Sequence, residues 1–234
     1  MATQSSHSIL PAPLAPAITP VPELEAGDQL TRPEFERRYA AMPWLKKAEL
    51  VDGVVYLGSP VSGLHAGAHS NLMTLFGVYA VGTPGTQCCD NATVAFDLEN
   101  EVQPDALLRI LAGGRSRVDK YIEGPPELVA EVATSSVSRD LHSKLALYRR
   151  HGVQEYVVWR TLDGDIDWFC LVEGNYERLA ADEHGVFRSR EFPGLWLDRP
   201  ALLRGDMAAA LAALNAGLAS AEHAAFVEQL AARK

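Results

Sequence analysis

The chain has 234 residues, of which 47% are hydrophobic, and a formal net charge of −9. This length allows one sizeable core, with or without appendages, and no stretch is long and apolar enough to suggest a membrane span. The acidic balance argues against tight, sequence-independent binding of nucleic acid. A local basic patch can still face phosphates, and the window 135–150 has four basic side chains against one acidic side chain.

The cysteine pattern points to a reduced protein. Cys88, Cys89 and Cys170 are odd in number and lack the spacing of a zinc site. The first residues lack the basic region of a secretory signal. We therefore expect a cytoplasmic protein with small buried thiols.

The N-terminal 29 residues are rich in proline and alanine, which favours a flexible arm over 1–29. Thr31 and Glu34 have the spacing of a capping box, and Pro33 lies between them. This combination predicts a helix that begins there and runs to about Met42.

Further elements follow from turn residues and from the spacing of apolar side chains. Residues 48–57 are typical of a hairpin that turns at Asp52–Gly53, and residues 64–81 have helical spacing. The remaining predictions are strands at about 86–97, 101–110 and 126–133, a helix at 138–150 that ends at Gly152, strands at 155–161 and 165–172, and one or two short strands before Pro193. This order predicts an α/β protein, more closely a mixed α+β sheet flanked by helices.

The composition changes near the C-terminus. Residues 206–233 are rich in alanine and have apolar side chains near the helical period, which predicts one or two amphipathic helices within 201–234. These helices could pack on the same core or on a second copy of the chain.

Asp105 and Glu131 stand out because both lie in apolar strand segments, where an unpaired charge is costly. Asp105 precedes the run 106–108, and Glu131 interrupts the run 126–133. A buried carboxylate normally takes up a proton, pairs with a cation or binds a metal. If the two strands are neighbours in a sheet, both carboxylates would meet at one point.

Two such carboxylates match the ligands of a magnesium ion, which keeps several waters besides. A divalent cation of this kind, Mg²⁺ or Mn²⁺, activates water and neutralises charge on a phosphate. Lys144 lies on the next predicted helix and is the candidate for a nearby ammonium. The pattern predicts a metal site for phosphodiester hydrolysis.

The sequence resembles a known family in several motifs that occur in the right order. The motifs are ELVDG (49–53), SPVSGLH (59–65), VQPDALL (102–108), ELVAEVATSS (127–136), RDLHSKLALYRRHGVQEYVVW (139–159) and PGLWLD (193–198). They are similar to those of the Uma-two-type restriction endonuclease family in the PD-(D/E)xK nuclease superfamily. The resemblance implies a restriction-endonuclease-like domain over 30–200, with the C-terminal helices as an extension.

The resemblance also implies roles for single residues. Asp105 matches the aspartate of the superfamily motif and Glu131 matches its second acid. The simplest pattern has a lysine two residues later, where this sequence has Ala133. The family tends to supply that lysine from the following helix, which Lys144 matches. Secondary candidates are Glu49 as an acid that joins the metal site, Gln103 beside the pocket, and His65.

Plain structural alternatives stay open for most of these residues. Lys144 could form a surface i,i+4 pair with Asp140, and Glu49 could face solvent on its hairpin. His65 could be a helix-cap residue. The basic residues Arg139, Arg149 and Arg150 could contact phosphates, or could simply lie at the end of a helix whose dipole favours them.

The leading hypothesis is a magnesium-dependent endonuclease that acts on DNA, although RNA stays open as a substrate. A homodimer would match the two-fold symmetry of a duplex. One alternative is a catalytically silent nuclease-fold binding or assembly module. Another is a hydrolase of small phosphorylated molecules, but the chain has no glycine-rich phosphate loop.

Overall fold

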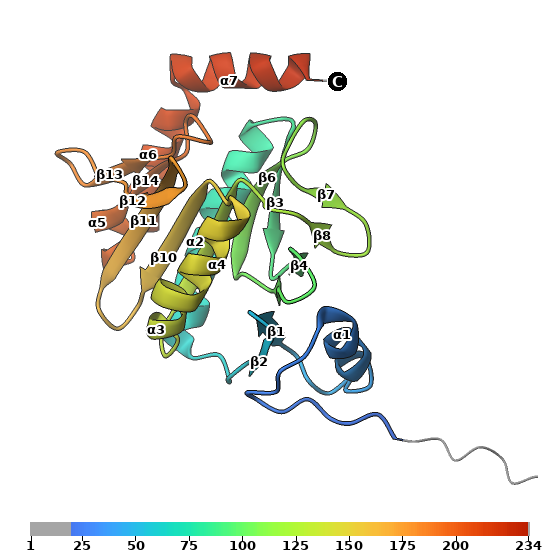
Figure 1. The fold of residues 1–234 in the computed structure, drawn as a ribbon. Helices are drawn as coiled ribbons and strands as arrows, with labels where there is room; N and C mark the ends of the chain where they lie inside the picture. Colours follow the sequence, from blue (N-terminus) through green and yellow to red (C-terminus); the bar gives the residue numbers. More distant parts are fainter. Residues whose placement is uncertain (1–19, 234) are drawn as a thin grey trace, which may run out of the picture.

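The computed structural model describes residues 20–233 (Figure 1). Its strands form a central sheet in the order β12-β11-β10-β9-β6-β3, a second sheet in the order β2-β1-β5-β4-β8-β7, and a hairpin of β13 and β14. Helices cover these sheets, so the mixed α+β fold predicted from the sequence is confirmed.

The elements have the following bounds. The central sheet contains β3 (Thr86–Asp90), β6 (Ala106–Ile110), β9 (Leu128–Ala133), β10 (Glu155–Arg160), β11 (Asp165–Val172) and β12 (Asn175–Arg178). The second sheet contains β1 (Ala48–Val51), β2 (Val54–Leu57), β4 (Val94–Ala95), β5 (Glu101–Val102), β7 (Arg117–Val118) and β8 (Ile122–Glu123), and the hairpin contains β13 (Val186–Arg188) and β14 (Trp196–Asp198). The helices are α1 (Arg32–Ala40), α2 (Gly63–Gly82), α3 (Val137–Arg139), a π-helical turn (Asp140–Lys144), α4 (Leu145–His151), α5 (Arg199–Arg204), α6 (Met207–Leu218) and α7 (Ala221–Ala232).

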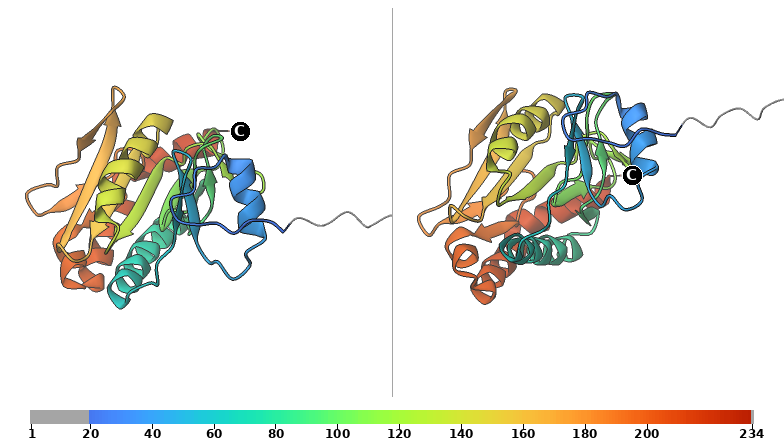
Figure 2. Two further views of the ribbon diagram at one scale, coloured as in Figure 1. Left: turned by 60° about the horizontal axis from the view of Figure 1, so that its bottom comes forward. Right: turned by 90° about the horizontal axis from the view of Figure 1, so that it is seen from below.

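The central sheet is covered on both faces (Figure 2). Leu72 and Phe76 of α2 pack with Leu108 on one face, and Leu147 of α4 packs with Leu107 on the other. The two parallel strands, β9 and β10, are joined by the crossover through α3, the π-helical turn and α4. Double coverage explains why every residue of β9 is buried, including its one acidic residue.

The N-terminal elements form a separate small core. Phe35 of α1 packs with Leu50, Val55 and Leu24 beside the β1–β2 hairpin. The predicted turn is confirmed, since Asp52 and Gly53 both have positive φ angles of 51° and 74°, as a tight hairpin requires.

Two expectations about this region need correction. The flexible arm was expected over 1–29; residues 1–19 lie outside the described part of the chain, but residues 20–29 pack on the hairpin, where Gly27 N–H donates to the carbonyl of Val55. The capping box does not form, because the Thr31 side chain makes no cap hydrogen bond. Glu34 instead pairs with Arg37 and Arg38, since two guanidinium groups on the same helix compete for its carboxylate.

The C-terminal helices complete the main core. Leu214 of α6 and Phe226 of α7 are buried in the same cluster as α2, and α6 runs against β14. At the closest point Gly217 lies so near Gly194 that a Cβ atom would be 2.2 Å from the Gly194 carbonyl oxygen. The buried faces of these helices are therefore used within one chain. Within residues 20–233, no helix combines the length and apolarity that crossing a membrane requires.

Candidate active site

Strand pairing brings the two predicted acids together. In the antiparallel pair of β6 and β9, Ala106 lies opposite Ala130, so the same register extended by one residue places Asp105 opposite Glu131. Both side chains point to the face of the sheet that α4 covers, and both are almost fully buried. Asp105 is held in place because its Oδ2 accepts a hydrogen bond from the Val132 N–H at 2.8 Å.

Lys144 is the last residue of the π-helical turn, and its side chain reaches the buried acids. Its Nζ is 2.7 Å from Glu131 Oε1 and 2.8 Å from Glu49 Oε1, and the residue is 0% exposed. Tyr148, one turn later, donates its hydroxyl to the same Glu131 oxygen at 2.9 Å. The structure thus brings Lys144 and Glu131 together, and the alternative of a solvated pair with Asp140 is wrong. A wide helical turn of this type is frequent at functional sites.

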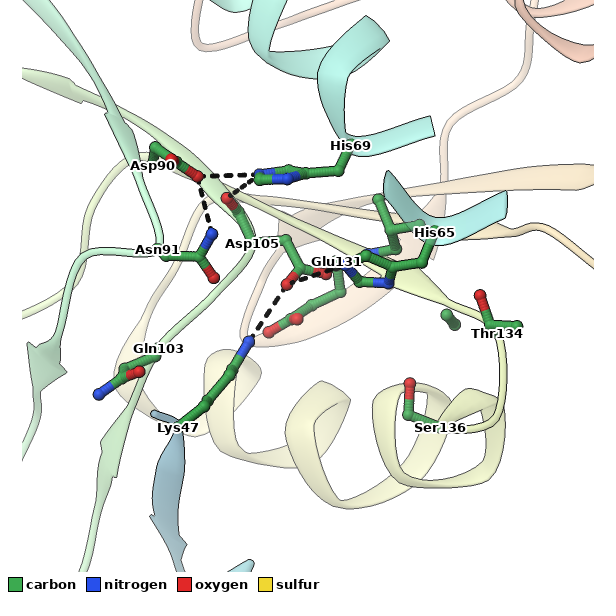
Figure 3. A network of polar contacts seen from close by, with 12 residues as sticks. Lys47, His65, His69, Asp90, Asn91, Gln103, Asp105, Glu131, Thr134 and Ser136 are labelled. Carbon is green, nitrogen blue, oxygen red and sulfur yellow. Dashed lines mark hydrogen bonds and ion pairs between the residues drawn. The ribbon is translucent and has the colours of Figure 1, made fainter. Parts of the chain in front are cut away.

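Glu49 comes from β1, in the other sheet. It is 2% exposed, and its Oε1 also accepts a hydrogen bond from the Gln103 backbone N–H at 2.9 Å. The interpretation of Glu49 as a solvent-facing hairpin residue is therefore wrong, because its carboxylate is buried against Lys144 and Arg139 of the segment that follows β9. Gln103 contributes its backbone only, and Figure 3 shows its side chain directed away from Asp105.

Lys47 is a residue that sequence reasoning missed. Its Nζ is 3.1 Å from Asp105 Oδ1, and 28% of its side chain is exposed. The signal was available, because Lys47 immediately precedes β1, and the alternation of the strand extended by one residue places it on the same face as Glu49. A predicted role for Glu49 would have pointed to Lys47 as well.

Two histidines of α2 approach Asp105 from the side opposite Lys47 (Figure 3). His65 lies in the first helical turn, where its N–H donates to the Ser62 hydroxyl, and its Nε2 is 3.7 Å from Asp105 Oδ1. His69 Nε2 is 2.8 Å from the Asp105 carbonyl oxygen and 2.9 Å from Asp90 Oδ1. His65 is thus a first-turn residue that also faces the acids.

The three basic residues singled out in the sequence separate in the structure. Arg139 lies at the site, with Nη2 3.8 Å from Glu49 Oε2 and its guanidinium over the Tyr56 ring. Arg149 instead donates to the Asn175 side chain, and Arg150 pairs with Asp52 on the surface. Neither of the latter two lines the cavity described next.

These residues surround a cavity of about 910 Å³ between the start of α2 and the loop that follows β9. Its wall is rich in hydroxyl groups, from Ser59, Ser62, Ser70, Thr134, Ser135, Ser136, Ser138 and Ser143. Its charged lining residues are Lys47, Arg139, Glu49, Asp90, Asp105 and Glu131, which give a formal charge of −2 with the histidines neutral. When the Lys144 ammonium behind Glu131 and Glu49 is counted, the formal charge is −1, so protein groups alone do not provide the positive charge that favours a phosphate.

The comparisons with known proteins agree with this architecture. A family profile named Uma2, described as "Putative restriction endonuclease", matches residues 32–200. The chain belongs to the Uma2 family. The crystal structure of a "putative nuclease belonging to DUF820" from Anabaena variabilis ATCC 29413 has a similar fold, with a TM-score of 0.56 and 12% sequence identity over 72% of this chain and 96% of that one. No curated protein matches the sequence.

The carboxyl groups of this Uma2 protein are electrostatically distinct. Burial, together with the neighbouring carboxylates, raises the pKa of Glu131 to about 8 despite the Lys144 ammonium. Burial also acts to raise the pKa of Asp105, but Lys47 and the Val132 N–H outweigh it and the net shift is downward. Glu49 likewise has a lowered pKa, because Lys144 and Lys47 outweigh the effect of its burial.

The donor set of this Uma2 site fits a magnesium-type ion bound by few protein ligands. In residues 20–233 no three or more His, Cys, Asp or Glu side chains are grouped as metal ligands. Two adjacent carboxylates are nevertheless what Mg²⁺ commonly takes from a protein, with waters and phosphate oxygens completing its shell. Among the described residues, Lys144 and Tyr148 donate the hydrogen bonds to the Glu131 carboxylate, and both go to Oε1. The other oxygen, Oε2, is therefore available as a metal ligand.

Proposed function

We propose that this protein is a metal-dependent endonuclease that hydrolyses phosphodiester bonds of DNA, with Asp105 and Glu131 as the ligands of Mg²⁺ or Mn²⁺. The observation that carries the proposal is the register of β6 and β9, which places these two carboxylates side by side at one cavity. Membership of the Uma2 family supports the reaction class.

Each residue around the acids has a defined part in this proposal. When bound, a divalent cation would supply an activated water and would neutralise charge on the phosphate. Lys144 and Tyr148 fix one oxygen of Glu131, and the Val132 N–H fixes one oxygen of Asp105. The second oxygen of each carboxylate is thereby oriented before any ligand arrives, which avoids reorganisation during the reaction.

The charge of the cavity supports a requirement for metal in substrate binding as well as in cleavage. Two basic residues face four carboxylates on its wall, and the Lys144 ammonium behind two of these brings the formal charge to −1, so one divalent cation would make it positive. We expect a short DNA duplex to bind in the presence of Ca²⁺ and to be released by EDTA. The observable is the fluorescence anisotropy of an end-labelled duplex.

Cleavage of supercoiled plasmid tests the proposal directly. Wild-type protein should cut with Mg²⁺ or Mn²⁺, and Asp105→Asn should lower the rate by on the order of 10²-fold or more, because the amide keeps the Val132 hydrogen bond but is a poor metal ligand. Asp163→Asn is the matched control, since Asp163 is half-exposed and lies outside the cavity. Undiminished cutting by Asp105→Asn, above a mock-purified sample, would contradict the proposal.

The alternative of a catalytically silent nuclease-fold module has its own signature. That module would show no heat of Mn²⁺ binding in calorimetry and no plasmid cleavage under either metal. Both results together would replace the enzyme by the binding module.

A further inference from the structure

We propose that Lys47, and not Lys144, is the residue whose ammonium contacts the phosphate undergoing cleavage. The inference rests on the proposed nuclease function and assigns a catalytic group within it. It follows from a difference between two lysines of the site, of which Lys47 pairs with Asp105 and Lys144 pairs with Glu131 and Glu49.

Lys144 has no access to the cavity. It is 0% exposed, it does not line the cavity, and its Nζ is held by two carboxylates at 2.7 and 2.8 Å. An ammonium that reached a substrate from this position would have to leave Glu131 and Glu49 behind as buried, unpaired charges, which is costly. Lys144 is therefore a positioning residue for Glu131.

Lys47 has the opposite properties. It lines the cavity, 28% of its side chain is exposed, and among residues 20–233 its only ion-pair partner is Asp105. Its ammonium is a mobile point charge on a flexible stem, so it can follow a phosphate oxygen over a short distance. Lys46, the preceding residue, is exposed and is not part of the cavity wall.

The partner of Lys47 shows what would release it. Asp105 Oδ2 is held by the Val132 N–H, so Oδ1, at 3.1 Å from Lys47 Nζ, is the oxygen left for a metal. A divalent cation on Oδ1 would compete with the ammonium for that oxygen. The two other carboxylates near Lys47, Glu131 and Glu49, are already hydrogen-bonded to Lys144. The released ammonium of Lys47 would then be free to pair with a phosphate that enters the cavity.

This competition gives a test with two readouts. Lys47→Met keeps most of the side-chain length and removes the charge, so it should bind Mn²⁺ severalfold more tightly in calorimetry while plasmid cleavage falls by on the order of 10²-fold. Lys47→Arg should recover part of the cleavage. Lys46→Met is the matched control and should equal wild type in both assays, and circular dichroism should show all three variants folded.

The outcomes separate this inference from the function on which it rests. If wild type cuts plasmid and Lys47→Met cuts it equally fast, the role of Lys47 is overturned and the proposed nuclease function is kept. Weaker Mn²⁺ binding by Lys47→Met would also overturn it, because the lysine would then support the metal and not compete with it. Wild type that neither binds Mn²⁺ nor cuts would overturn the nuclease and the inference together.

Discussion

Replacing Lys144 by methionine should destabilise the protein strongly, even though it removes only one ammonium. Lys144 is fully buried and is the shared partner of Glu131 and Glu49. Removing one member of a buried ion pair typically costs about 3–5 kcal/mol, because the other charge stays buried without compensation.

The structure favours the lower part of that range. Glu131, whose pKa is already raised to about 8, can take up a proton when the ammonium is removed. Glu49 keeps its hydrogen bond from the Gln103 N–H and its contact with Arg139 at 3.8 Å. We therefore expect a loss of about 3 kcal/mol in the free energy of unfolding for Lys144→Met.

Urea denaturation followed by tryptophan fluorescence measures this loss, since Trp159 and Trp168 are buried in the main core. With an m-value of about 3 kcal/mol/M, the unfolding midpoint should fall by about 1 M urea. Lys46→Met should leave the midpoint unchanged. The double variant Lys144→Met/Glu131→Gln should recover part of the loss, because a neutral amide at position 131 removes whatever free energy is needed to neutralise Glu131 without its ammonium partner. A midpoint shift for Lys144→Met no larger than that of Lys46→Met would refute the reasoning.

Two further predictions concern residues away from the cavity. Burial raises the pKa of Glu155 to about 7, so between pH 4.5 and pH 7 the folded protein retains a proton that the unfolded chain has released. The free energy of unfolding should therefore fall across this window, by at most roughly 3 kcal/mol. Urea midpoints at pH 5 and pH 7.5 should show a smaller fall in Glu155→Gln than in wild type, and an equal fall in both proteins would count against this group. Gly217→Ala should lower the free energy of unfolding by about 3 kcal/mol, since its Cβ would meet the Gly194 carbonyl oxygen at 2.2 Å. Its control, Gly67→Ala, has open space on α2 and should instead stabilise by about 0.5–1 kcal/mol, so equal effects of the two changes would contradict the packing argument.

The parts of the site that sequence could predict are those that depend on local pattern. An acid inside an apolar strand is visible without a structure, and this singled out Asp105 and Glu131. The helix after the second strand was equally visible, which is why Lys144 could be linked to Glu131. Register between the two strands was then enough to bring the acids together.

The parts that sequence could not predict depend on contacts between elements. Glu49 is buried because the second sheet lies against the central one, and a hairpin pattern alone does not reveal what covers it. Whether a lysine faces the cavity or the core also depends on this packing, so the spacing of Lys47 and Glu49 could place both on one face but could not show that the Lys47 ammonium lines the cavity. Arg149 and Arg150 lie on α4, as Tyr148 of the site does, but their side chains pair with Asn175 and Asp52 outside the cavity.

The antiparallel pairing of β6 and β9 also determines which changes of chain length the site can tolerate. Asp105 and Glu131 are opposed by the ladder itself, whereas the segment 111–127 that joins the two strands lies outside it. That segment includes β7 and β8, so the place for a change of length is the turn 119–121 between them. An insertion there leaves the spacing of the carboxylates unchanged, because the ladder sets that spacing, and a longer turn adds little entropic penalty. A slip of a single residue within either strand would turn one carboxylate to the face covered by α2 and abolish the site. Relatives of this protein can therefore differ in the length of this exposed turn, but they must keep the register of the two strands.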